Sequence, residues 1–168
     1  MRLVITGNGG SGKTWLGEQI ARRASVPLIR LDDVYWAGAY GGEGRDKPTV
    51  FCDVQALADG EAWIIEGIYG WLLPAALPRA THFVFNDLPL EDCLANLRAR
   101  GEQGGGDAAA FQTMLDWVAG YPIRSNVYSR SHHRGLWDQF AGNKILLADR
   151  ADVTRCAADW PGPPDGRL

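Results

Sequence analysis

Lysine is scarce in this chain: there are three, Lys13, Lys47 and Lys144, against fourteen arginines. The net charge is −3 at pH 7, so the surface as a whole carries no excess of positive charge that would attract nucleic acid or an anionic membrane. We therefore predict no nucleic-acid and no membrane partner. The scarcity also sets Lys13 apart, because it stands in the one motif of the chain that requires a lysine.

Long apolar runs are also missing. No stretch approaches the ~20 residues that a membrane helix needs, and the first apolar run has only the length of a strand, where a signal peptide would have a longer one. We therefore expect a cytoplasmic protein. The three cysteines, Cys52, Cys93 and Cys156, are far apart and form no C-x-x-C pair. We expect them to be buried free thiols, with neither a disulfide nor a metal site.

The 168 residues suffice for one domain with a substantial core. Short apolar runs alternate with segments of helical periodicity, which is typical of an α/β fold with a parallel sheet covered by helices on both faces. The predicted strands are residues 3–6, 28–31, 62–65, 81–85 and 144–147. The predicted helices are residues 13–24, 48–58, 71–77, 90–100, 107–119 and 153–160, with part of 124–140.

The most specific pattern is G-x-x-x-x-G-K-[ST], placed between a predicted strand and a predicted helix as a phosphate-binding loop (P-loop) must be. Glycines let consecutive backbone amides turn toward an anion, and the helix N-terminus adds partial positive charge. In such a loop the lysine reaches the β- and γ-phosphates, and the final hydroxyl is a ligand of Mg²⁺. We therefore predict that ATP and Mg²⁺ bind at Gly7, Asn8, Gly9, Gly10, Ser11, Gly12, Lys13 and Thr14.

The same stretch satisfies the shorter pattern G-x-G-x-x-G of dinucleotide-binding folds, with Gly7, Gly9 and Gly12. Asp32 lies 20 residues beyond Gly12, where such a fold places an acid that binds a ribose. A dinucleotide loop has no need of a Lys-Thr pair directly after its third glycine, so the P-loop is the favoured interpretation. An NAD(P)-dependent oxidoreductase stays open as a lesser alternative.

Other classes of P-loop protein fit poorly. A GTPase reads its base with N-K-x-D, and residues 143–146 of this chain, Asn-Lys-Ile-Leu, end in leucine where the acid should stand. An AAA-type ATPase or helicase is normally longer and carries an apolar run that ends in Asp-Glu, which this chain lacks. A small kinase pattern remains.

Further segments extend that pattern along the chain, and each follows a predicted strand or closes a predicted helix. With the P-loop, they resemble the adenylate kinase-related P-loop kinases, and most of all the group labelled DNA topology modulation (FlaR-like) proteins. The resemblance spans nearly the whole chain. The segments that carry it are Leu31-Asp32-Asp33-Val34-Tyr35-Trp36, Trp63-Ile64-Ile65-Glu66-Gly67-Ile68-Tyr69, Asn86-Asp87-Leu88-Pro89 and Arg98-Ala99-Arg100.

The resemblance implies a three-layer P-loop fold: a five-stranded parallel sheet with the P-loop strand in the middle, and a short lid. It implies that Glu66 holds Mg²⁺ through water, and that Asp33, or its neighbour Asp32, faces the phosphoryl acceptor. Arg100 and Arg124 match lid arginines, which neutralise charge on the transferred phosphoryl group. The expected catalytic residues are therefore Lys13, Asp33, Glu66, Arg100 and Arg124.

The chain departs from adenylate kinases at Asn96, where they carry an arginine, so we do not infer adenylate kinase activity itself. We expect an ATP-dependent phosphotransferase whose small-molecule acceptor the sequence does not identify. An ATP-binding regulator or DNA-associated protein without kinase activity stays open. We expect one domain over residues 1–160, with the lid and following helices at about 97–141, and a tail over 161–168.

Three weaker expectations concern single side chains. Asp87 is placed to cap the helix that begins near Leu90. His132 and His133 have no other ligand-type residues beside them in the sequence, so we expect them at the surface. Aromatic residues that follow the two acid-bearing strands could either line an acceptor pocket or pack in the core, and both readings stay open: Trp36, Tyr40, Tyr69 and Trp71.

Overall fold

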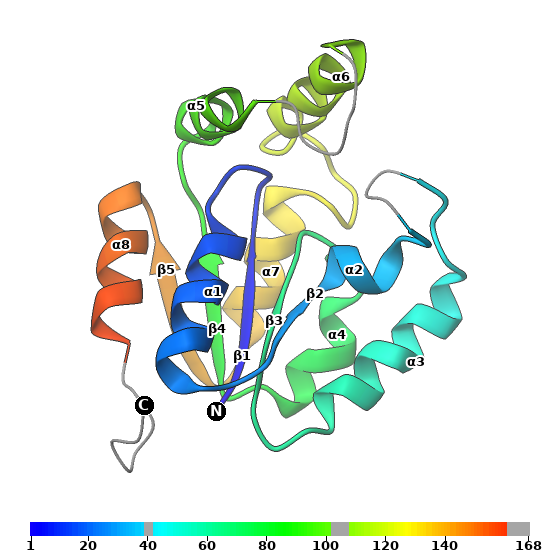
Figure 1. The fold of residues 1–168 in the computed structure, drawn as a ribbon, viewed down its shortest axis with the longest axis vertical. Helices are drawn as coiled ribbons and strands as arrows, with labels where there is room; N and C mark the ends of the chain where they lie inside the picture. Colours follow the sequence, from blue (N-terminus) through cyan, green and yellow to red (C-terminus); the bar gives the residue numbers. More distant parts are fainter. Residues whose placement is uncertain (39–41, 102–107, 161–168) are drawn as a thin grey trace.

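The structure, a computed structural model, describes residues 1–38, 42–101 and 108–160. Its centre is a five-stranded, fully parallel sheet in the order β2-β3-β1-β4-β5, which places the P-loop strand in the middle as predicted (Figure 1). The strands are β1 (Arg2–Gly7), β2 (Leu28–Arg30), β3 (Trp63–Glu66), β4 (His82–Asn86) and β5 (Asn143–Leu147).

Helices cover both faces of the sheet, and two more lie beyond the carboxyl end of β1 (Figure 1). One face carries α1 (Lys13–Ala24) and α8 (Arg150–Asp159), and the other carries α3 (Lys47–Ala58), α4 (Leu73–Ala76) with a 3-10 turn (Leu77–Arg79), and α7 (Arg130–Gln139). The short α2 (Leu31–Tyr35) follows β2. The two helices beyond the carboxyl end of β1 are α5 (Leu90–Arg100) and α6 (Ala108–Ala119).

The burial of β1 explains why its sequence is a continuous apolar run. Leu3, Val4 and Ile5 are all fully buried. Leu3 and Ile5 belong to the core under α1 and α8, whereas Val4 belongs to the core under α3, α4 and α7. Successive side chains of a strand point to opposite faces, so a sheet covered on both sides needs apolar residues at every position. The three-layer P-loop fold predicted from the sequence is therefore confirmed.

The second strand is shorter than predicted. It ends at Arg30, and the chain turns at once into α2, so that Asp32 and Asp33 lie in the first turn of a helix rather than beyond a strand. Acidic side chains are favourable there because they complement the partial positive charge of a helix N-terminus. Leu31 is buried tightly against Gly67, where an added Cβ would come within 2.8 Å of it. This contact fixes both acids at the carboxyl edge of the sheet.

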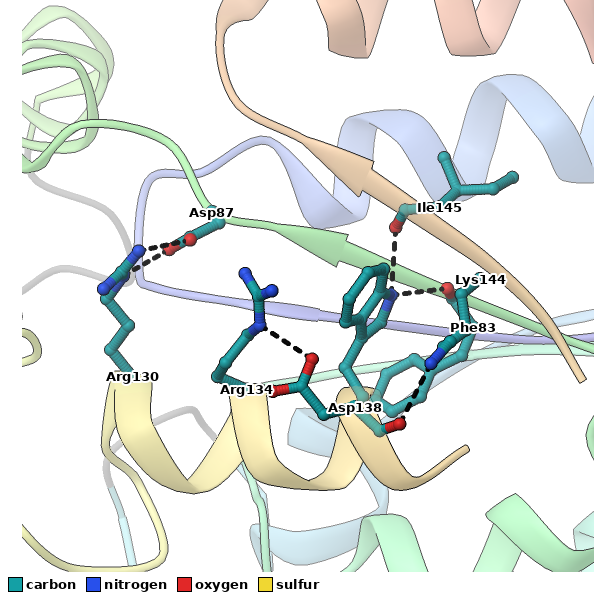
Figure 2. A network of polar contacts seen from close by, with 8 residues as sticks. Phe83, Asp87, Arg130, Arg134, Asp138, Lys144 and Ile145 are labelled. Carbon is teal, nitrogen blue, oxygen red and sulfur yellow. Dashed lines mark hydrogen bonds and ion pairs between the residues drawn. The ribbon is translucent and has the colours of Figure 1, made fainter. Parts of the chain in front are cut away.

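The prediction that Asp87 caps a helix is wrong. The residue before α5 is Pro89, whose side chain has no group that could cap the helix. Asp87 instead accepts two hydrogen bonds of 2.6 Å from the guanidinium of Arg130, at the start of α7 (Figure 2). The Trp137 indole N–H, also on α7, donates to the carbonyl oxygens of Phe83 and Ile145 on the neighbouring strands. Tertiary packing of α7 therefore overrides the local capping pattern.

The cysteines meet the expectation only in part: Cys93 is buried and Cys156 half-buried, but Cys52 is exposed. All three are free thiols. Asp107, Tyr40 and the predicted tail of residues 161–168 lie outside the described residues. Within the described ranges, no helix has both the length and the apolarity to cross a membrane.

Candidate active site

The P-loop connects β1 to α1 and is shaped by glycines. Gly10 and Gly12 have φ angles of +75° and +83°, in the left-handed region that side chains disfavour. A Cβ added to Gly10 would lie 2.3 Å from the carbonyl oxygen of Cys93. The first amides of α1 have no partner within the helix, so they and the glycine backbone can bind an anion.

Three asparagine side chains hold the backbone of the P-loop. The Asn86 amide, at the end of β4, donates to the Ser11 carbonyl at 3.0 Å. The Asn96 amide, on α5, donates to the Gly10 carbonyl at 2.8 Å. Asn8 within the loop donates to the Val118 carbonyl on α6 at 3.1 Å. The loop is therefore preorganised by neutral donors from the elements around it.

Lys13 begins α1 and is buried under this loop. Its ammonium donates a hydrogen bond of 2.7 Å to the Asn8 carbonyl oxygen. Burial lowers the pKa of Lys13, while the nearby carboxylates of Glu66 and Asp32 raise it. A buried cation with one neutral hydrogen-bond partner is a suitable receptor for a phosphate group.

Glu66, at the end of β3, lies beside the P-loop because β3 pairs with β1. Its Oε1 accepts a hydrogen bond of 2.8 Å from the Thr14 hydroxyl. The Glu66 side chain is almost fully buried, and burial raises its pKa. Carboxylate and hydroxyl oxygens are the donor set that Mg²⁺ prefers, so Thr14 and Glu66 fit the metal that the sequence predicts there.

The two acids on α2 differ in their surroundings. Asp32 is half-buried, accepts a hydrogen bond from the Tyr69 hydroxyl, and acts electrostatically on both Lys13 and Glu66. Asp33 also lines the cavity, but its side chain is exposed. The role of Asp33 stays a prediction, and these contacts favour Asp32 as the acid that lies nearer to the phosphate site.

A cavity of about 1040 Å³ opens above the P-loop and joins these groups. Arg100, at the end of α5, lines it together with both acids of α2, as the predicted roles require. Arg124 is not among the residues that line it. The Arg124 guanidinium stacks on Trp117 at 4.2 Å and hydrogen-bonds to the Trp117 carbonyl. The structure thus brings together Lys13, Asp33, Glu66 and Arg100 but not Arg124.

Several lining residues were not predicted from the sequence. The face of α6 toward the cavity is apolar and carries Phe111, Met114 and Trp117, where the resemblance implied a lid with arginines. Trp15 and Arg150 are two further lining residues that were not predicted. Arg150 could have been found, since it begins the helix directly after the fifth strand, at the edge of a parallel sheet where ligands bind.

Four aromatic residues were expected either to line an acceptor pocket or to pack in the core. Of these, Tyr69 is buried in the core and hydrogen-bonds to Asp32. The Trp71 indole donates to the Tyr128 hydroxyl at 3.0 Å. Neither Trp36 nor Trp71 is among the residues that line the described cavity. Packing against neighbouring rings is therefore their main role.

His133 is fully buried, so the prediction of a surface histidine is wrong for this residue. Its Nδ1 lies 2.8 Å from the Tyr121 hydroxyl and its Nε2 lies 3.1 Å from the Ile68 carbonyl oxygen. The adjacent residues on either side are polar, but Leu136 and Trp137, three and four positions further along α7, are apolar and pack against the core. That helical spacing is the signal that could have indicated the burial of His133. Partners far along the chain satisfy both ring nitrogens.

One orphaned atom bears on whether a nucleotide fits. The Ser11 hydroxyl is fully buried and has no hydrogen-bond partner among the described residues. A buried hydroxyl without a partner is costly unless a ligand satisfies it. Together with the cradle that glycine Cβ atoms would fill, this favours an anionic group in the P-loop.

Comparisons with solved structures agree with this geometry. No protein-family model and no curated protein sequence matches the chain. Shikimate kinase from Acinetobacter baumannii in complex with shikimate is 15% identical, with a TM-score of 0.57, over 93% of this chain and 88% of that chain. Shikimate kinase from Aquifex aeolicus is 17% identical, with a TM-score of 0.55, over 95% and 92%.

A gluconokinase from Sinorhizobium meliloti is 18% identical, with a TM-score of 0.52, over 94% of this chain and 93% of that chain. At such identities the likeness concerns the fold and not the reaction. The chain is therefore similar, along nearly its whole length, to the P-loop fold in which these kinases are built.

Proposed function

We propose that the chain is a kinase that transfers the γ-phosphoryl group of ATP to a small-molecule acceptor with the help of Mg²⁺. The observation that carries the proposal is the 2.8 Å hydrogen bond between Thr14 and Glu66, beside a buried lysine and beneath a large cavity. A P-loop that only bound nucleotide would not need a second carboxylate, Asp32, in the lining of the same cavity.

The protein groups divide the work as follows. The Lys13 ammonium leaves the Asn8 carbonyl and instead donates hydrogen bonds to the β- and γ-phosphates. Thr14, and Glu66 through water, would hold the metal, which would neutralise charge on the phosphates. Asp32 orients the acceptor hydroxyl or takes its proton, and the Tyr69 hydroxyl fixes the orientation of the Asp32 carboxylate.

Arg100 stabilises the charge that spreads over the transferred phosphoryl group. Arg124 would join it only if the segment after α6 moved, because its guanidinium now contacts Trp117. We keep the lid at about residues 97–141 of a single domain over 1–160. We also propose that the chain is related to the adenylate kinase-related, FlaR-like proteins and that it is cytoplasmic.

The acceptor is a small hydroxyl- or phosphate-bearing molecule. The solved kinases of similar fold act on sugars, gluconate or shikimate by their names, which makes such compounds the first acceptors to test. The cavity volume leaves room for a nucleotide and a second small molecule together.

The test is an ATP-consumption screen over sugars, sugar acids, nucleosides and nucleoside monophosphates, with the Lys13→Met variant as control. We expect at least one acceptor to accelerate ATP consumption, and we expect the variant to lose about 100-fold or more of that rate. Equal rates in both proteins would contradict the proposal. Thermal stabilisation by NAD but not by ATP with Mg²⁺ would instead support the hypothesis of an NAD(P)-dependent oxidoreductase.

A further inference from the structure

The chain contains three histidines, and only His133 is fully buried. A carbonyl oxygen can only accept, so the hydrogen bond to Ile68 places the ring proton on Nε2. Nδ1 must then accept from the Tyr121 hydroxyl. One neutral tautomer satisfies both bonds. Burial lowers the pKa of His133 to about 3, and the positive charges of Lys13 and Arg124 act in the same direction.

At one end of this pair of bonds lies the segment that follows Glu66. The Gly67 amide donates to the Ile5 carbonyl at 3.1 Å, and the Gly67 carbonyl accepts from the Thr6 hydroxyl at 2.9 Å. The next carbonyl, that of Ile68, is the one that His133 holds. The backbone after Glu66 is thus fixed first by β1 and then by α7.

At the other end lies the carboxyl end of α6. Tyr121 is almost fully buried, and its amide donates to the Val118 carbonyl at 3.1 Å. The same carbonyl accepts the Asn8 amide from the P-loop. Hydrogen bonds and short backbone links therefore form a closed ring, which we call the P-loop ring. In order, it contains Asn8, Val118, Tyr121, His133, Ile68, Glu66 and Thr14. The hydrogen bond from Lys13, which precedes Thr14, to the Asn8 carbonyl closes it.

We propose that His133 and Tyr121 are positioning residues for Glu66, which hold its carboxylate in place for the metal and connect that place to the end of α6. The proposal rests on the proposed function, in which Glu66 holds Mg²⁺. Residues that orient a metal ligand without touching the metal typically contribute 10–100-fold to metal affinity, so removing one bond of the ring has a measurable effect.

The test compares ADP binding by calorimetry in excess Mg²⁺ and in EDTA, for the wild-type protein and for Tyr121→Phe. This substitution removes one hydroxyl and keeps the buried ring. We expect wild-type protein to bind ADP more tightly with Mg²⁺ than without it. In Tyr121→Phe we expect that ratio to fall about tenfold, while the Kd in EDTA stays within about twofold of wild type.

Tyr128→Phe is the matched control. Tyr128 lies in the same connection between α6 and α7, and its hydroxyl accepts from the Trp71 indole rather than bonding to His133. We expect its ratio to equal that of the wild type. A Tyr121→Phe protein that is folded and keeps the wild-type ratio would overturn the positioning role and leave the kinase proposal standing. Wild-type protein that binds ADP equally well with and without Mg²⁺, or not at all, would overturn the metal role of Glu66 and this inference with it.

A second measurement uses the unmodified protein, so it does not depend on how the variant folds. In ¹⁵N-labelled protein we expect one histidine to keep a protonated Nε2 and an unprotonated Nδ1 from pH 5 to pH 8. A spectrum in which all three histidines titrate in that range would show that the hydrogen-bonded form of His133 does not exist.

Discussion

The side-chain amide of Asn96 donates a 2.8 Å hydrogen bond to the carbonyl oxygen of Gly10, so α5 holds the P-loop directly. Asn96 is the position at which adenylate kinases, by the sequence resemblance, carry an arginine. A neutral donor at this place shapes the loop but adds no charge for the phosphates. The attraction for phosphate therefore depends all the more on Lys13 and Arg100, which line the same cavity.

Asn96→Ala should loosen the P-loop. Without its partner, the half-buried Gly10 carbonyl loses its hydrogen bond, which costs about 1–2 kcal/mol. We expect a lower free energy of unfolding in urea and weaker ADP binding by calorimetry. Asn143→Ala, at an exposed position on β5 where the side chain contacts His82, serves as control and should leave ADP binding unchanged. Unchanged ADP affinity in Asn96→Ala would show that the loop keeps its shape without α5.

The two acids of α2 should differ in their catalytic effect. Asp32 receives the Tyr69 hydroxyl and interacts with Lys13, whereas Asp33 is exposed. We expect Asp32→Asn to lower kcat by about 10²–10⁴-fold, the usual contribution of a general base, and Asp33→Asn to lower it less. Steady-state rates with the best acceptor of the screen decide between them. The reverse order would restore the sequence-based choice of Asp33.

Arg100→Ala and Arg124→Ala separate a side chain that lines the cavity from one that packs beside it. We expect Arg100→Ala to lose about 10²–10³-fold in kcat, as a lost donor to the transition state does. Arg124→Ala should mainly lower the melting temperature, because it removes the contact with Trp117. If both variants lose kcat equally, Arg124 reaches the phosphates after a rearrangement, as the sequence predicted.

Glu66→Gln should show a distinct pH dependence of stability. The pKa of Glu66 is raised in the folded protein above its ordinary value of 4.5, mainly by burial. Below pH 4.5 the carboxyl is protonated in both states; as the pH rises above 4.5, the unfolded chain ionises first, and folding becomes less favourable until the folded pKa is passed. Wild-type protein should therefore lose free energy of unfolding relative to Glu66→Gln between pH 4 and pH 7.

Urea unfolding of both proteins at several pH values measures this difference. A difference that stays constant from pH 4 to pH 7 would mean that Glu66 is ionised normally in its buried position. The same variant should lose the Mg²⁺ dependence of ADP binding, because a neutral amide holds metal-bound water less well than a carboxylate does.

The sequence predicted the order of elements and the course of α1, because these depend on local apolar patterns and on one specific motif, and the family resemblance implied the central place of β1. The resemblance also implied that Glu66 and Thr14 share a site, and the structure joins their side chains by a hydrogen bond because β3 pairs with β1. The sequence did not reveal that His133 is buried or that Asp87 binds Arg130. Both depend on where α7 packs against the sheet, and those contacts join residues that lie far apart in the sequence.

The split between Arg100 and Arg124 has the same origin. Arg100 ends a helix whose bounds the sequence predicts, so its approach to the cavity follows from the fold. Arg124 lies in a connection between α6 and α7, where the stacking on Trp117 decides its direction. Trp15 and Trp117 were missed for a related reason: large apolar residues usually mark the core, and here they stand at 44% and 39% exposure beside the cavity.

The apolar inner face of α6 bears on how the cavity would respond to its surroundings. Phe111, Met114 and Trp117 offer carbon surface to whatever enters, and burial of such surface strengthens on warming from low temperature and is little affected by moderate salt. Phosphate binding at the P-loop is electrostatic, so it weakens as ionic strength rises. Temperature should therefore act mainly on ligand contacts with the apolar face of α6, and salt mainly on phosphate binding at the P-loop.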